Sequence, residues 1–98
     1  MKSLQENSEI IRNHADEIRN KFGVKSLCIF GSVARNEQTP HSDVDICVDM
    51  APKMMLVIRL KRYLENILNC SVDLIRLHKN MNLFLKQQID RDGIYILQ

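Results

Sequence analysis

Two short apolar stretches separated by a polar loop constrain the fold of this 98-residue chain more than any other feature. The first, residues 27–30, ends at Gly31 and Ser32, and the second begins around Asp43 and Asp45. Because successive side chains of a strand point to opposite faces, the two aspartates share one face while the apolar residues between and after them turn into the core. The stretch therefore predicts two strands, the second with a pair of carboxylates on one face.

The carboxylate pair indicates a metal site. Two neighbouring carboxylates repel each other unless one is protonated or a cation lies between them. A hard divalent cation suits oxygen ligands, and Mg²⁺ takes one or two carboxylates together with waters and substrate phosphates. Asp43 and Asp45 therefore predict a metal-bound phosphate rather than a structural ion.

The residues after the first strand are suited to hold that phosphate. Glycine at position 31 lets the backbone approach a ligand closely, and a helix that begins at Ser32 points free amide groups at an anion. The Ser32 hydroxyl and, one turn later, the Arg35 guanidinium can contact the same phosphate groups. Ser42 is expected to hold the loop through its hydroxyl, and a phosphate contact is the alternative.

The two motifs together resemble a known signature. Gly-Ser-x-Ala-Arg at residues 31–35 and Ser-Asp-x-Asp at residues 42–45 are similar to the signature of the nucleotidyltransferase superfamily that includes DNA polymerase beta. More narrowly, they resemble the minimal nucleotidyltransferases, the antitoxin partners of HEPN-domain ribonucleases. The family also has a third carboxylate on a later strand, which Asp73 matches. The family often has glycine after the arginine, where this chain has Asn36, a residue that also tolerates a left-handed turn.

The resemblance implies a fold and a reaction. The implied fold is an α/β core in which helices back a mixed β-sheet, and the implied reaction transfers AMP from ATP to a hydroxyl, expected to be that of a tyrosine, on a cognate HEPN ribonuclease toxin. Two Mg²⁺ ions are expected on Asp43, Asp45 and Asp73, with Asp73 activating the acceptor hydroxyl. The implied nucleotide-binding residues are Gly31, Ser32, Arg35 and Ser42.

The length of 98 residues predicts a single domain over residues 1–98. Hydrophobic periodicity and turn residues predict its helices and strands. Helices are expected at residues 8–22, 53–69 and 81–92, with a short helical turn at 32–36. Strands are expected at residues 24–30, 43–50, 71–77 and 94–97, with a polar turn at 78–80. Alternation places Asp73 on the face of its strand opposite its apolar neighbours, but only the strand order decides whether it meets Asp43 and Asp45.

Some residues are expected at helix ends or on apolar faces. Ser8 is the expected N-cap of the first helix, and Gly23 and Gly93 are expected stops. Leu83, Leu85 and Ile89 are expected on the apolar face of the last helix.

Composition indicates which classes of partner the chain binds and in which cell compartment it is expected. With 14 basic and 12 acidic residues the net charge is +2, and direct binding to nucleic acid is not expected. The three cysteines are isolated, as expected of small buried residues in a reducing cytoplasm. The first residues lack the apolar core of a signal peptide, and the longest apolar run, residues 54–58, is too short to span a bilayer. A cytoplasmic protein without a membrane partner is therefore expected.

Three functions remain open at this point. The first is enzymatic AMP transfer to the toxin, and the second is neutralisation of the toxin by binding alone. The third is nucleotidyl transfer to RNA or to a small molecule. The combined presence of Ser32, Asp43, Asp45 and Asp73 favours the enzyme, because occlusion of a toxin needs no metal-binding carboxylates.

Overall fold

A four-stranded mixed sheet in the order β3-β2-β1-β4 forms the centre of the computed structural model, which describes residues 2–78 and 80–98. The helices are α1 (Leu4–Asn13), α2 (Ala15–Phe22), α3 (Gly31–Ala34), α4 (Met54–Leu68) and α5 (Leu83–Asp92). The strands are β1 (Ser26–Phe30), β2 (Val44–Asp49), β3 (Val72–Arg76) and β4 (Ile94–Leu97). The predicted α/β class is confirmed, and the expected turn at 78–80 includes Lys79, which lies outside the described residues.

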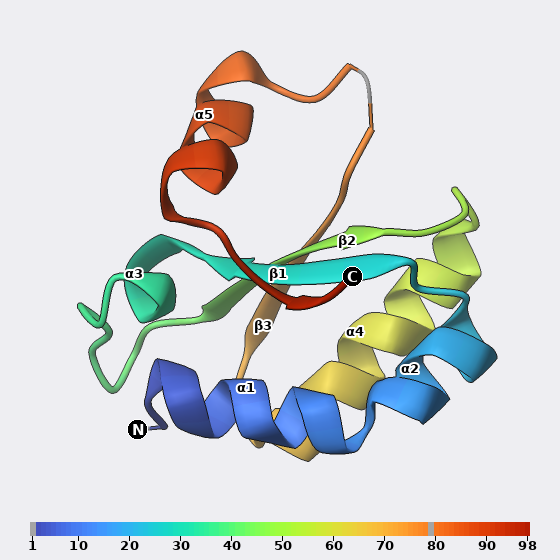
Figure 1. Ribbon diagram of the computed structural model, residues 1–98, viewed down its shortest axis with the longest axis horizontal. Coiled ribbons are helices and arrows are strands. Elements are labelled where there is room, and N and C mark those ends of the chain that lie inside the picture. Colours follow the sequence, from blue (N-terminus) through green and yellow to red (C-terminus); the bar gives the residue numbers. More distant parts are fainter. Residues whose placement is uncertain (1, 79) are drawn as a thin grey trace.

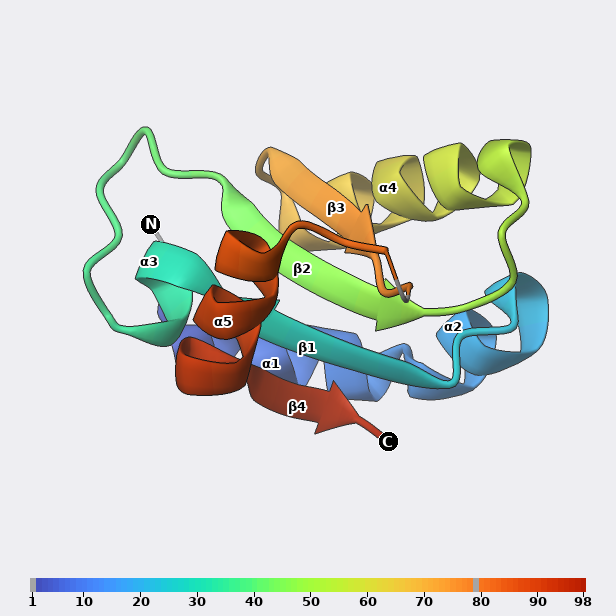
Figure 2. The same cartoon turned by 90° about the horizontal axis from the view of Figure 1, so that it is seen from above.

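The strand directions follow from the connections between them. β1 is antiparallel to both β2 and β4, whereas β2 and β3 are parallel. Parallel neighbours need a crossover, and α4 supplies it between β2 and β3. The C-terminal end of β1 therefore lies at the same edge of the sheet as the N-terminal ends of β2 and β3 (Figure 2).

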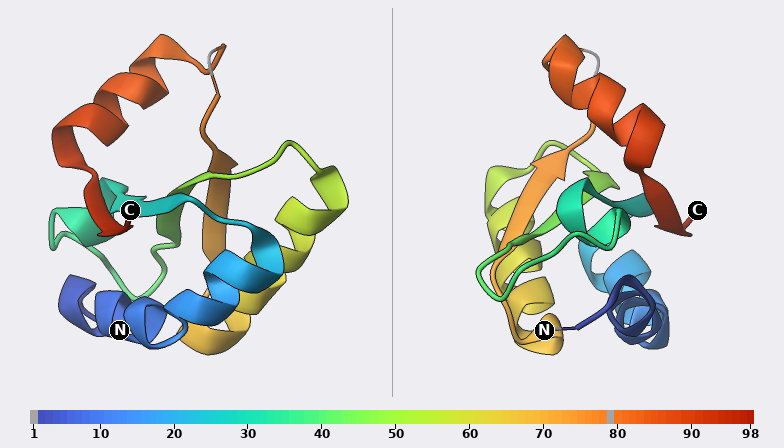
Figure 3. Two further views of the ribbon diagram at one scale, coloured as in Figure 1. Left: turned by 45° about the vertical axis from the view of Figure 1, so that its right-hand side comes forward. Right: turned by 90° about the vertical axis from the view of Figure 1, so that its left-hand side faces the viewer.

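Helices cover both faces of the sheet, but unequally. α1, α2 and α4 lie on one face, and α5 lies alone on the other (Figures 1 and 3). The larger core fills the space under the three helices, with Ile29, Ile46 and Leu64 fully buried in it. A smaller core under α5 contains Cys28, Phe30, Cys47 and Ile89. The predicted carboxylates lie where β2 and β3 begin: Asp43 just before β2, Asp45 near its start and Asp73 near the start of β3.

The N-terminal helix differs from the prediction at both its start and its middle. It begins at Leu4 because Ser3 and Glu6 form a capping box, in which the Ser3 hydroxyl accepts from the Glu6 amide at 3.1 Å and the Glu6 carboxylate accepts from the Ser3 amide at 3.1 Å. Ser8 was therefore the wrong N-cap; it lies inside α1 and is buried. The helix also breaks at His14, where α2 begins, while Gly23 ends α2 as predicted.

The last helix begins two residues later than predicted. Asn82 is its N-cap, and the Asn82 side chain accepts from the amides of Phe84 at 2.8 Å and Leu85 at 3.3 Å. This start points Leu83 and Phe84 into solvent, so the prediction that Leu83 lies on the apolar face was wrong. Ile89 is buried as expected. Among the described helices, none has both the length and the hydrophobicity needed to cross a membrane.

Candidate active site

The strand order brings the third carboxylate to the other two. In the parallel register of β2 and β3, Asp45 is paired directly with Asp73. In the antiparallel register of β1 and β2, Asp45 is paired with Phe30, the residue before Gly31. Asp43 immediately precedes β2 at the same edge, so the carboxylates and the start of α3 lie together. Asp43 and Asp73 are exposed, whereas Asp45 is partly buried.

The charges of Asp43 and Asp73 act on the partly buried Asp45. The pKa of Asp45 is raised from 3.8 to about 6, first because burial penalises the charged form and then because the charges of Asp73 and Asp43 lie nearby. Arg35 acts in the opposite direction but does not cancel these effects. A cation bound at this edge would favour the charged form of Asp45 and so oppose the effects of burial and of the neighbouring charges.

Gly31 has two reasons to be glycine. Its φ of 71° lies in the left-handed region, which a β-carbon disfavours. In addition, a β-carbon at this position would lie on Oδ2 of Asp45. The turn into α3 is thus packed directly against the carboxylate. Asn36, at the other end of this turn, has a φ of 57°, so it adopts the left-handed conformation that asparagine was expected to tolerate.

The loop between α3 and β2 is held by its own side chains. The Ser42 hydroxyl accepts from the Thr39 amide at 2.9 Å and lies 3.1 Å from the Thr39 hydroxyl. This is the loop-holding contact expected of Ser42, and it fixes the approach of the chain to Asp43.

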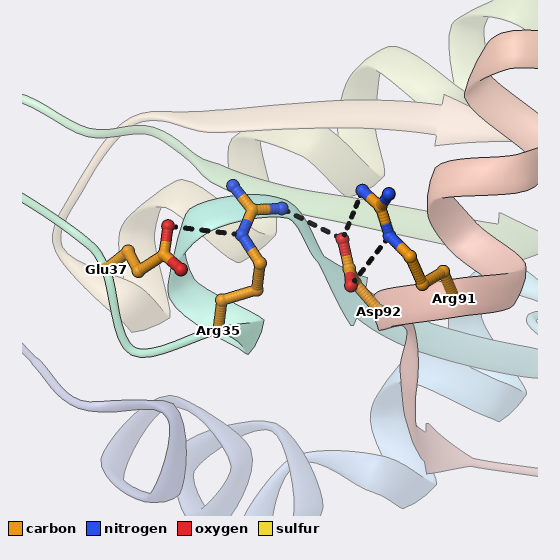
Figure 4. Close-up of polar contacts among 4 residues, drawn as sticks. All are labelled: Arg35, Glu37, Arg91 and Asp92. Carbon is orange, nitrogen blue, oxygen red and sulfur yellow. Dashed lines mark hydrogen bonds and ion pairs between the residues drawn. The ribbon is translucent and has the colours of Figure 1, made fainter.

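Arg35, the predicted phosphate ligand, contacts two carboxylates. Its Nη1 donates to Oδ2 of Asp92 at 2.9 Å, and its Nε donates to Oε2 of Glu37 at 3.3 Å (Figure 4). Asp92 is the last residue of α5 and was missed by sequence reasoning. No local signal could have found it, because 57 positions separate the two residues.

The donor set fits an open metal site. Across residues 2–78 and 80–98, no three His, Cys, Asp or Glu side chains are grouped closely enough to hold a metal ion together. Mg²⁺ does not require three such side chains, because it takes one or two carboxylates and completes its shell with water and phosphate oxygens. Asp45 with Asp43 or with Asp73 supplies such a partial set, beside the turn expected to hold phosphate.

A cavity of about 480 Å³ opens beside Asp43. It lies between the start of α1, the loop before β2 and the turn before β3. Its lining is mostly polar and includes Lys2, His41, Ser42, Asn69 and Ser71. Its volume is in the range of small-molecule sites, and of the three carboxylates only Asp43 lines it, so it offers room for part of a substrate beside Asp43 and away from the Gly31 turn.

Comparison with known proteins agrees with this geometry. The sequence profile of the family described as Polymerase beta, Nucleotidyltransferase matches residues 12–98. A presumed protein adenylyltransferase of Methanocaldococcus jannaschii, MJ0126, is 46% identical over 98 residues, which cover 98% of this chain and 100% of the relative. Protein adenylyltransferase MntA of Thermococcus cleftensis is 35% identical, with 98% of each chain covered.

Solved structures of similar fold also point to the nucleotidyltransferases. The structure of a presumed minimal nucleotidyltransferase is 28% identical with a TM-score of 0.76, and the match covers 95% of each chain. A crystal structure described as a toxin–antitoxin with AMP-PNP has a TM-score of 0.70 at 25% identity, covering 87% of this chain and 71% of the other. By sequence and by fold, the chain therefore belongs to the polymerase beta nucleotidyltransferase family of enzymes, as one of its minimal nucleotidyltransferases.

Proposed function

We propose that this chain is an antitoxin that transfers AMP from ATP to a hydroxyl, the side chain of a tyrosine, on a HEPN ribonuclease toxin. The observation that carries the proposal is the meeting of Asp43, Asp45 and Asp73 at one sheet edge beside the Gly31 turn. The names of the relatives support AMP as the transferred group, because one is named a protein adenylyltransferase and the other a presumed one. The toxin–antitoxin structure with AMP-PNP supports ATP as the donor and a toxin as the partner.

Each part of the site has a role in this reaction. The triphosphate lies with its β- and γ-phosphates on Gly31, Ser32 and Arg35, and with its α-phosphate near Asp45. Mg²⁺, expected as two ions held by the aspartates, supplies charge neutralisation on the phosphates when bound. Ser42 holds the loop that carries Asp43 into place.

The step itself is an in-line displacement. The acceptor oxygen forms a bond to the α-phosphorus while the bond between that phosphorus and the bridging oxygen breaks, and pyrophosphate leaves with the electron pair. Asp73 is on β3, on the far side of β2 from the Gly31 turn at the end of β1. An acceptor that approaches from the β3 side is therefore opposite the leaving group, and Asp73 can take the hydroxyl proton.

The test is a mass measurement on the partner. We would incubate the product of the adjacent gene, the place where we expect the HEPN toxin, with the chain, Mg²⁺ and each nucleoside triphosphate in turn, and record its intact mass. We expect an increment of one or more AMP groups with ATP, and its loss in the Asp43→Asn, Asp45→Asn double variant. Asp49→Asn is the matched control, because Asp49 is at the other end of β2.

The same variants separate transfer from binding alone. If the double variant still neutralises the toxin and no mass increment forms with the wild-type chain, the chain acts by occlusion and the proposal is wrong. If the increment appears on RNA or on a small molecule instead, the acceptor class is wrong.

A further inference from the structure

The two carboxylates that contact Arg35 are held very differently. The Asp92 side chain is 11% exposed, and both Nε and Nη2 of Arg91 donate to it at 3.2 Å. The Glu37 side chain is 64% exposed, and within the described residues it contacts no charged group except Arg35. Figure 4 shows the row: Glu37 on one side of Arg35, Asp92 on the other, and Arg91 beyond Asp92. Asp92 is therefore anchored, and Glu37 is not.

From this difference we propose that Asp92 is a positioning residue that holds Arg35 at the phosphate site, and that Glu37 occupies the place on Arg35 that a nucleotide phosphate takes. The inference rests on the proposed function, since it assumes a nucleoside triphosphate at the Gly31 turn. It assigns opposite effects to two carboxylates that contact the same guanidinium.

Charge and geometry favour replacement of the Glu37 carboxylate on Arg35 by a phosphate. A single exposed carboxylate bond to arginine contributes little in water, whereas a phosphate offers several oxygens and more negative charge to the same planar donor group. Arg35 uses Nη1 for Asp92 and Nε for Glu37, and among the described residues no side chain accepts from its Nη2. Release of Glu37 would leave Nε and Nη2 free together, the pair of donors that binds two oxygens of one phosphate.

Asp92, in contrast to Glu37, is expected to stay on Arg35 when a phosphate binds. Its charge is shared by Arg35 and Arg91, so it does not neutralise Arg35 completely. Its backbone is fixed because α5 passes directly into β4 at Gly93, whose amide donates to the Ile89 carbonyl at 2.8 Å. A β-carbon at Gly93 would lie on that carbonyl, so the joint admits no larger residue without a shift. Ile89 is buried against the sheet, which ties Asp92 to the same sheet that carries the carboxylates.

The test measures binding of MgATP to the full chain by calorimetry, without an acceptor. We expect Asp92→Asn to raise the dissociation constant about threefold to tenfold, the range for one partly exposed charged contact. Glu37→Gln should leave the constant unchanged or lower it. Both effects should vanish in an Arg35→Gln background, because both residues act through Arg35. Asp92→Glu should recover part of the affinity.

Kinetics add a measurement, the change in KM for ATP relative to kcat, that would not change if Asp92 had a purely structural role. Asp92→Asn should raise KM for ATP with little change in kcat for AMP transfer. Arg91→Gln should shift KM in the same direction by a smaller factor; Arg91 is 70% exposed, so this variant tests the anchor even if Asp92→Asn folds poorly.

The outcomes separate this inference from the function it rests on. If the wild-type chain binds no nucleoside triphosphate, the proposed function fails and the inference with it. If the wild type binds MgATP but Asp92→Asn binds as tightly or more tightly, Asp92 competes with phosphate and the inference alone is wrong. An Asp92→Asn effect that persists without Arg35 also overturns it, because Asp92 would then act through the fold.

Discussion

Replacement of Asp45 by asparagine should stabilise the metal-free protein while it removes activity. In the folded chain the pKa of Asp45 is raised from 3.8 to about 6 by burial and by Asp73 and Asp43. At 1.36 kcal/mol per pKa unit, the full rise corresponds to about 3 kcal/mol of lost stability once the group is charged. Asp45 is only partly buried, so solvent screening reduces this figure, and we expect about 1–2 kcal/mol.

The direction in which stability changes with pH follows from how tightly each state binds the Asp45 proton. The folded state holds the Asp45 proton more tightly than the unfolded state, so the wild type loses stability as the pH rises from about 3.8 to about 6 and does not regain it at higher pH. Asparagine carries no charge at any of these pH values. The advantage of Asp45→Asn should therefore be full at pH 8 and shrink towards zero at pH 4.

The assay is thermal unfolding followed by circular dichroism in EDTA. For a domain of this size 1 kcal/mol corresponds to about 5 °C, so Asp45→Asn should raise Tm by about 5–10 °C at pH 8. Added Mg²⁺ should raise Tm of the wild type more than that of the variant. The reasoning is refuted if the variant is less stable than the wild type at pH 8, or if its gain is equal at pH 4 and pH 8. Asp49→Asn, at the far end of β2, should show no such gain.

Three further changes test other parts of the structure. Gly31→Ala should destabilise the fold by about 1–3 kcal/mol and abolish transfer, because it strains a left-handed residue and displaces the Asp45 carboxylate; melting and the mass assay measure both effects. Ser3→Ala should lower stability by about 1 kcal/mol in urea unfolding, because it removes the cap of α1, and an unchanged midpoint would contradict the capping box. Under native conditions a maleimide should label Cys70 before the other two thiols, which are buried, and intact mass after each time point would show any earlier second adduct.

Local spacing together with the family resemblance predicted most residues of the candidate site. Alternation along a strand places Asp43 and Asp45 on one face, and the Gly-Ser pair marks the end of the preceding strand whatever the tertiary structure. Asp73 was a different case. Its position within its own strand could be predicted, but its place beside Asp45 depends on β3 being the parallel neighbour of β2, which the order of elements along the chain does not determine.

The errors at helix ends have local causes. The first apolar stripe suggested that the helix begins near Ser8. Ser3 and Glu6 have the spacing of a capping box, a signal in the sequence that the prediction overlooked. In the last helix the apolar pattern included Leu83, but the Asn82 cap sets the rotation of the first turn and leaves that side chain in solvent. A cap decides which residues face the core at a helix end, and periodicity decides it only further inside.

What no sequence pattern could supply is the energetic state of the site. Gly31 is close enough to Asp45 that the two positions constrain each other, and Arg35 is held by α5 through a residue 57 positions away. Both contacts arise only when the sheet and α5 have assembled. The assembled fold also raises the pKa of Asp45, first by burial and then through the charges of Asp73 and Asp43, and it places Arg35 between Asp92 and the exposed Glu37. A cation bound beside Asp45 would favour its charged form, and a triphosphate would take the place of Glu37 on Arg35, so the free protein holds both groups in states that the proposed ligands would change.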